Sequence, residues 1–205
     1  AANNTAVGFK ALCTNTTGTA LVAIGDRALS ANTTANNNIA IGQQSMFTNT
    51  TGASNVSIGA SAMYANTTGN SNSSIGFLAG AQNTDGDGNT SIGSYAGCNI
   101  TTGCYNTYVG AESNSSSATV LFEQVFGRGG TGKGSNTFFS GASANGVFNT
   151  ANATAWTQTS DRRIKKNIVN NNTGLDKINQ IQVRDFEYRT KAEVTDFENA
   201  EAAYV

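Results

Sequence analysis

A 17-residue repeat constrains this chain more than any other feature. Its marker is an apolar β-branched residue followed by glycine, and it recurs seven times without an insertion: Val7-Gly8, Ile24-Gly25, Ile41-Gly42, Ile58-Gly59, Ile75-Gly76, Ile92-Gly93 and Val109-Gly110. An eighth pair, Phe126-Gly127, keeps the register. Self-similarity at a fixed short period is typical of a solenoid, in which a coil buries its apolar side only against its neighbours.

The rest of each repeat favours β structure. Apolar residues alternate at the strand period of two before the glycine, as at Val22 and Ile24. The segment after the glycine is compatible with a single helical turn. We therefore expect a mainly β solenoid, a β-roll or β-helix with 17-residue coils. A disordered Asn/Thr/Gly tract is the alternative, and the strict register argues against it.

Asparagine marks two further positions in the repeat. One lies four residues before the glycine, at Asn4, Asn38, Asn55, Asn72, Asn89 and Asn106. The other opens Asn-Thr-Thr turns at Asn15, Asn32, Asn49 and Asn66, which also satisfy the N-glycosylation pattern. We favour a structural role for these turns, because Asn and Thr suit turns and can stack as hydrogen-bonded ladders between coils.

Composition excludes several classes of function. The 205 residues include no histidine, which excludes histidine acid–base catalysis and ordinary zinc sites. The formal net charge of −1 offers no basic field for nucleic acid. No apolar run approaches the roughly 20 residues of a membrane span. We expect no cofactor and no metal. Residue 1 falls in mid-repeat, which indicates a fragment of a longer chain.

The three cysteines do not form a disulfide framework. Cys98 and Cys104 lie six residues apart and could pair, whereas Cys13 has no obvious partner. We favour the interpretation that the cysteines are small buried side chains that fill space within the coils.

Charge divides the chain into parts. Only five charged residues precede residue 111, whereas 161–205 holds eight acidic and eight basic residues. We expect a solenoid at 1–114, a β-rich neck at 115–159 and a separate domain at 160–205. Each coil offers only about two sizeable apolar side chains, too few for a self-sufficient core. Sharing the apolar edges between copies would solve this, so we expect a homotrimer.

Two short motifs invite a ligand-binding interpretation. The glycine run from Gly127 to Gly134 contains Lys133 but lacks the spacing of a phosphate-binding loop, and we interpret it as a flexible turn. Asp85 and Asp87 lie in a Gly-rich turn, which favours a turn or a weak cation site over a catalytic pair.

The segment Ser160-Asp-Arg-Arg-Ile-Lys-Lys-Asn-Ile168 is the most informative one outside the repeats. A helical spacing at Leu175, Ile178 and Ile181 and a strand ending at Phe186 and Tyr188 follow it. Together they resemble the intramolecular chaperone of phage tail spikes and fibres, the endosialidase-type, self-cleaving S74 peptidase family. The resemblance implies that 160–205 is the N-terminal part of a small α+β chaperone that trimerises the fibre.

This resemblance also implies a cleavage chemistry. Ser160 matches the cleavage-site serine, Lys165 matches its lysine partner, and the Ser160–Asp161 bond is the one cut, with Asp161 sharing the work. A lysine desolvated on assembly loses its proton more readily and can serve as base to a serine hydroxyl. Without the resemblance, we would interpret Ser160 as a residue that caps a turn, and the basic residues that follow it as a solvent-exposed face. No external substrate is expected.

The repeats themselves resemble the head modules of trimeric autotransporter adhesins, whose Asn-x-Ala-Ile-Gly coils form β-rolls. Our leading expectation is a structural and adhesive segment of a trimeric phage tail fibre, extracellular on the virion, that binds a host cell-surface glycan or protein receptor. The alternatives are a cell-surface adhesin head and a glycan-depolymerising spike. Ice binding ranks last, because the threonines fall in turns.

Overall fold

The computed structural model describes residues 2–143, 145–150 and 157–158. These residues form strands and turns and contain no helix. The strands are β1 (Thr5–Val7), β2 (Val22–Ile24), β3 (Ile39–Ile41), β4 (Val56–Ile58), β5 (Ser73–Ile75), β6 (Thr90–Ile92), β7 (Thr107–Val109), β8 (Gln124–Phe126), β9 (Phe138–Ala142), β10 (Asn145–Asn149) and β11 (Thr157–Gln158). The predicted mainly β solenoid is confirmed.

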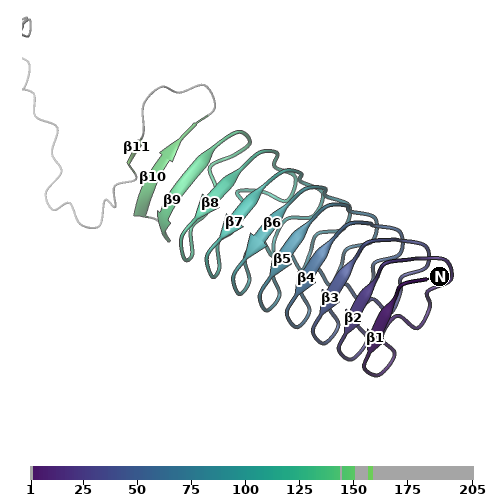
Figure 1. Ribbon diagram of the computed structural model, residues 1–205. Helices are drawn as coiled ribbons and strands as arrows, with labels where there is room; N and C mark the ends of the chain where they lie inside the picture. Colours follow the sequence, from purple (N-terminus) through teal and green to yellow (C-terminus); the bar gives the residue numbers. More distant parts are fainter. Residues whose placement is uncertain (1, 144, 151–156, 159–205) are drawn as a thin grey trace, which may run out of the picture. The chain divides into compact units, whose positions relative to one another are not determined.

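The strands stack in chain order into one sheet (Figure 1). From β1 to β8 neighbouring strands are parallel, and each residue pairs with the one 17 positions later, as Thr5 does with Val22. Phe126 pairs with Val109, which confirms the eighth repeat marker. The step to β9 is shorter, since Gln124 pairs with Phe138. Strands β10 and β11 then run antiparallel to their neighbours.

The column of marker glycines explains why the coils can lie so close together. Each of these glycines has φ between 118° and 138°, a region that side chains disfavour. Each also faces the glycine of the next coil. A Cβ on Gly93, for example, would lie 2.7 Å from the carbonyl oxygen of Gly110. Glycine is therefore required here both by backbone conformation and by space.

The single helical turn considered for the segment after each glycine is wrong. The second and fourth residues after the glycine adopt left-handed conformations, as shown by Arg27 at φ 55° and Leu29 at φ 49°. A right-handed helix needs negative φ at every residue. The alternation of left-handed residues instead bends the chain around a corner of the coil.

The interior of the solenoid is narrow. The middle residue of each strand from β2 to β8 faces inward, and in the N-terminal coils it is Ala23 or Ala40, which packs with Leu29, Met46 and Met63 in one buried cluster. Further along, the Leu/Met position becomes glycine. A Cβ on Gly97 would lie 2.7 Å from the ring of Tyr108, so this glycine makes room for a buried aromatic side chain. A second cluster around Tyr108 and Phe139 fills the C-terminal coils.

Two columns of buried asparagines run along the interior, as predicted for the Asn-Thr-Thr turns. In the first, the Nδ2 of Asn32 donates to Oδ1 of Asn15 at 3.0 Å, and Asn49, Asn66 and Asn83 continue the pattern. In the second, Oδ1 of Asn38 accepts the backbone N–H of Asn55 at 2.8 Å. The ladder predicted for the Asn-Thr-Thr turns is confirmed, and the second column is a further ladder. The first column ends at Asn83, whose buried Oδ1 has no partner within the described residues, because Ile100 takes the next position.

The prediction for the cysteines is wrong in part. All three thiols are free, so Cys98 and Cys104 are not paired. Cys13 is exposed and the other two are partly exposed, so none of the three is fully buried. Cys13 and Cys98 lie at the corner of the coil that also carries Phe47 and Tyr64.

Candidate functional site

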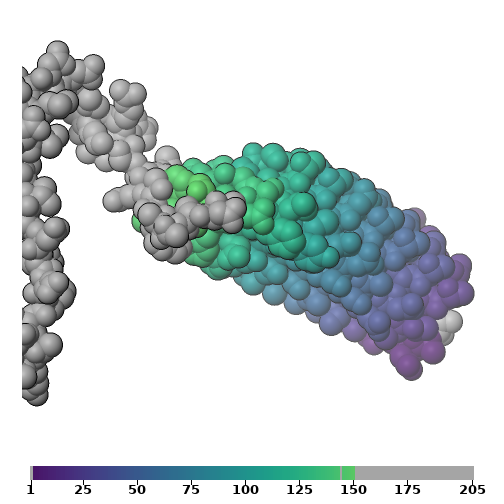
Figure 2. All heavy atoms as spheres, turned by 90° about the horizontal axis from the view of Figure 1, so that it is seen from above, coloured from purple at the N-terminus to yellow at the C-terminus, as the bar shows by residue number. Residues whose placement is uncertain are grey.

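One face of the sheet presents an apolar column to the outside. The first and third residues of strands β2 to β8 point away from the interior, and from β2 to β7 the third is the β-branched residue of the repeat. Ile24, Ile58, Ile75 and Ile92 are 37–40 % exposed. No charged residue occupies an outward position in these strands. We call this column, Ile24 to Val109, the isoleucine face. In the space-filling view the coils that carry it follow one another without a break (Figure 2).

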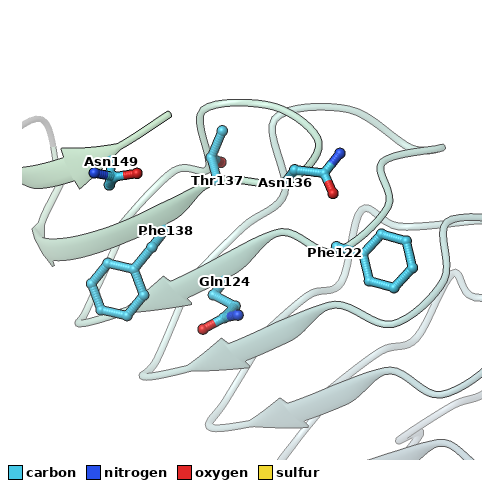
Figure 3. Close-up of a pocket in the computed structure, with 6 residues that line it drawn as sticks. All are labelled: Phe122, Gln124, Asn136, Thr137, Phe138 and Asn149. Carbon is cyan, nitrogen blue, oxygen red and sulfur yellow. The ribbon is translucent and has the colours of Figure 1, made fainter. Parts of the chain in front are cut away.

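A shallow groove of about 340 Å³ lies at the C-terminal end of the stack. Its lining comes from β8, β9, β10 and the turns before them: Phe122, Gln124, Asn136, Thr137, Phe138 and Asn149. Figure 3 shows the rings of Phe122 and Phe138 toward opposite ends, with Gln124 and Asn136 between them. We call it the β8–β9 groove.

Flat aromatic rings continue the groove on both sides. Phe122 is 50 % exposed and stacks on Tyr105 of the preceding coil, with ring centroids 5.3 Å apart and planes inclined by 10°. Phe138 stacks on Phe126 at 5.4 Å. The 17-residue register aligns the first pair, because the two rings occupy the same coil position.

A buried carboxylate, Glu123, lies in the chain between the groove residues Phe122 and Gln124. Glu123 takes the place of an asparagine in the second ladder, and its backbone N–H donates to Oδ1 of Asn106 at 2.8 Å. The side chain is fully buried and accepts hydrogen bonds from the hydroxyl of Tyr108 and from the N–H groups of Ser116 and Gly134, at 2.9 to 3.1 Å. A Cβ at position 132 would collide with this carboxylate, so Gly132 leaves the space that it occupies.

The surroundings of Tyr108 change the acidity of its hydroxyl group. Burial, together with the negative charge of Glu123, raises the pKa of the Tyr108 hydroxyl well above its usual range. The hydroxyl therefore remains a proton donor to the carboxylate at any physiological pH. This pair stabilises the coil and offers no reactive group to solvent.

The acidic turn at Asp85 and Asp87 is held by hydrogen bonds within the solenoid. Asp85 accepts from the hydroxyls of Thr67 and Thr68, and these bonds lower the pKa of its carboxyl group. Asp87 accepts from the backbone N–H of Asn70 at 2.6 Å. Among the described residues no group of three potential metal ligands occurs. The two carboxylates extend the turn ladders between coils.

The residues predicted to carry the cleavage chemistry, Ser160, Asp161 and Lys165, lie outside the described residues. The expected helix and strand at 175–188 lie outside them as well.

The comparison with protein families bears on this part of the chain. Residues 160–203, about a fifth of the chain, match the Peptidase S74 family, described as the chaperone of endosialidase. The predicted resemblance to the endosialidase chaperone is confirmed. This chaperone-like segment therefore follows a β-solenoid in one chain, an arrangement that fits a tail fibre or spike assembly. No curated protein and no solved structure gave a match. No helix in the described part of the chain is long and apolar enough to cross a membrane.

Sequence reasoning missed the groove and the buried carboxylate, although both left a signal. Counting in the 17-residue register places Glu123 in the asparagine column, where an acid is out of pattern. The same count places Tyr105 and Phe122 at one coil position. What the register does not reveal is that this position faces outward.

Proposed function

We propose that this chain is a structural and host-contacting segment of a trimeric viral tail fibre, assembled by a C-terminal chaperone that cuts itself off. The coarser statement is already supported, since a solenoid joined to a segment matching the endosialidase chaperone fits a tail fibre or spike. The trimer, the cleavage, the location on the virion and the host contact are the steps that we add.

The isoleucine face is the observation that carries the proposal. Its side chains recur once per coil, and adjacent strands of a sheet lie about 4.8 Å apart, so the column is continuous. Extended apolar patches on a protein surface mark interaction sites. The absence of charge at the outward positions of β2 to β8 means that like faces do not repel one another. Sister copies of the same chain are therefore suitable partners.

Sharing this face would also compensate for the narrow interior. The inward position of the strand is a serine in the middle coils, at Ser57, Ser74 and Ser91, so these strands bury little apolar surface by themselves. Burial of apolar surface contributes roughly 25 cal/mol per Å², and the exposed side chains of the outward column could supply it. Three copies around one axis would bury the column on each of them.

Cleavage completes the proposed assembly. Lys165 loses its proton when desolvated and assists the hydroxyl of Ser160, with Asp161 contributing to the reaction. Hydrolysis of the Ser160–Asp161 peptide bond consumes one water molecule. It leaves a carboxylate on Ser160 and an amino group on Asp161. The fibre segment and the chaperone-like segment would then separate.

The test uses the full chain with Ser160→Ala, Lys165→Ala and, as the matched control, Lys166→Ala. Intact-mass spectrometry should show a wild-type product ending at Ser160, its loss in the first two variants and its persistence in Lys166→Ala. Light scattering should give three times the mass of the product ending at Ser160 for the wild-type protein. A wild-type chain that stays whole would contradict self-cleavage, and a stable monomer would contradict the assembly.

A further inference from the structure

We propose that the β8–β9 groove binds a neutral saccharide. This inference rests on the proposed host-contacting function and assigns it to particular residues. The volume of about 340 Å³ is within the range of small-ligand sites and suits one or two sugar rings.

The aromatic side chains supply the apolar part of the site. Sugar rings present flat C–H surfaces, which pack on exposed aromatic faces. Tyr105 and Phe122 are 57 % and 50 % exposed and stack with their planes 10° apart, so the stack holds the ring of Phe122 in one orientation beside the groove. Phe122 has φ 57°, and this left-handed conformation fixes the backbone from which its ring projects.

The amide side chains supply the polar part. Each amide offers both a donor and an acceptor, which matches the dual character of a sugar hydroxyl. Gln124 and Asn136 are exposed, and neither side-chain amide has a hydrogen-bond partner in the part of the chain that the structure describes. The asparagines of the interior columns differ, because they are buried and bonded to neighbouring coils.

The charge of the lining residues and the position of the groove along the stack distinguish between possible ligands. None of the lining residues is charged, which favours a neutral ligand over an acidic polysaccharide or a basic peptide. A sister copy is disfavoured because the first outward position of the strand changes along the stack. It is apolar at Val22, Ile39 and Val56 but becomes Gln124 in β8. The outward surface beside the isoleucine face is therefore less apolar near the groove than in the N-terminal coils.

The experiment applies the full chain to an array of neutral hexose and N-acetylhexosamine oligosaccharides, with sialylated and uronic-acid oligosaccharides as charged comparators. Phe122→Ala and Gln124→Ala test the groove. Tyr95→Ala is the matched control, because Tyr95 is also an exposed aromatic residue with φ 57° and a ring partner, Phe77, yet lies outside the groove. Light scattering on each protein reports its assembly.

We expect wild-type protein to bind neutral members of the array. Phe122→Ala should weaken that binding at least about tenfold, and Tyr95→Ala should leave it unchanged. Binding that persists in Phe122→Ala, binding confined to charged saccharides, or a trimer that binds no saccharide would each overturn the groove assignment while leaving the fibre proposal intact. Loss of the trimer in Phe122→Ala would identify the groove as an interface between copies and would also overturn it. A monomeric wild-type chain would contradict the proposed function itself.

Discussion

The Nδ2 of Asn66 donates a hydrogen bond to Oδ1 of Asn49, its counterpart in the preceding coil, at 2.8 Å. The same nitrogen donates to the carbonyl of Gly69 in its own turn at 3.1 Å. One amide therefore closes a turn and joins two coils. Repetition of this relationship converts a 17-residue spacing in the sequence into a fixed register in space.

Removing one member from the middle of this column should destabilise the solenoid. In Asn66→Ala, Oδ1 of Asn49 loses its side-chain donor, the carbonyl of Gly69 loses one of two donors, and Nδ2 of Asn83 loses one of two acceptors. Buried polar groups without partners are costly, so we expect a loss of about 2 to 4 kcal/mol in the free energy of unfolding by urea. The exposed Thr51→Ala should cost less than about 0.5 kcal/mol. Equal midpoints for the two variants would contradict the role of the column.

Two Gly→Ala variants can distinguish the cost of an unfavourable backbone conformation from the cost of a steric clash between coils. Gly93→Ala forces a methyl group against the carbonyl of Gly110, in addition to the cost of φ 130°. Gly134 has φ 114° but no atom within 4 Å of an added Cβ, so Gly134→Ala carries the conformational cost alone, roughly 1 to 2 kcal/mol. Gly93→Ala should lose at least about 2 kcal/mol more in thermal or urea unfolding. A similar loss in both variants would show that the coils can move apart at little cost.

A charge on the isoleucine face should prevent assembly without unfolding the coil. Ile58 is 37 % exposed, so Ile58→Lys can direct its ammonium group into water in an isolated chain. In the trimer that group would be buried without a partner. We expect light scattering to report monomer for Ile58→Lys and trimer for Thr51→Lys, which places the same charge on an exposed turn. A trimeric Ile58→Lys protein would contradict the use of this face.

Alkaline pH should weaken the C-terminal coils through Tyr108. Because its folded-state pKa is raised, the neutral hydroxyl contributes its full stability below the unfolded pKa of about 10 and loses it as pH rises above that value. The free energy of unfolding should fall there by up to about 1.4 kcal/mol per pH unit. Tyr108→Phe should be less stable at pH 8 but should lack this additional slope. If the free energy of unfolding varied with pH in the same way for wild type and Tyr108→Phe, this role of Tyr108 would be contradicted.

The repeat allowed the strands, their register and the asparagine ladders to be predicted, because each follows from a spacing that the chain repeats. The path between strands could not be predicted, since left-handed residues such as Leu29 and Met46 carry side chains that also suit a helix. The residues that depart from the repeat could not be interpreted from the sequence either. Gly97 and Tyr108 compensate for each other across the interior, and such a pair is visible only when both are seen in space.

The chemistry at Ser160 was predicted from a motif, and the family match supports the motif while leaving the roles of Asp161 and Lys165 as predictions. The groove could not be predicted, because its residues come from three strands and two turns that the sequence alone does not bring together.

The constant offset of 17 residues from β1 to β8 has a consequence for how such a rod can change in size. Adding or deleting one whole repeat in the middle returns every glycine and asparagine to a matching neighbour, so the body lengthens or shortens by one strand spacing, about 4.8 Å. An insertion whose length is not a multiple of 17 residues would break the alignment of the glycine and asparagine columns. The length of the solenoid therefore changes only in whole strand spacings, and duplication of the coding sequence for one repeat is enough to lengthen it.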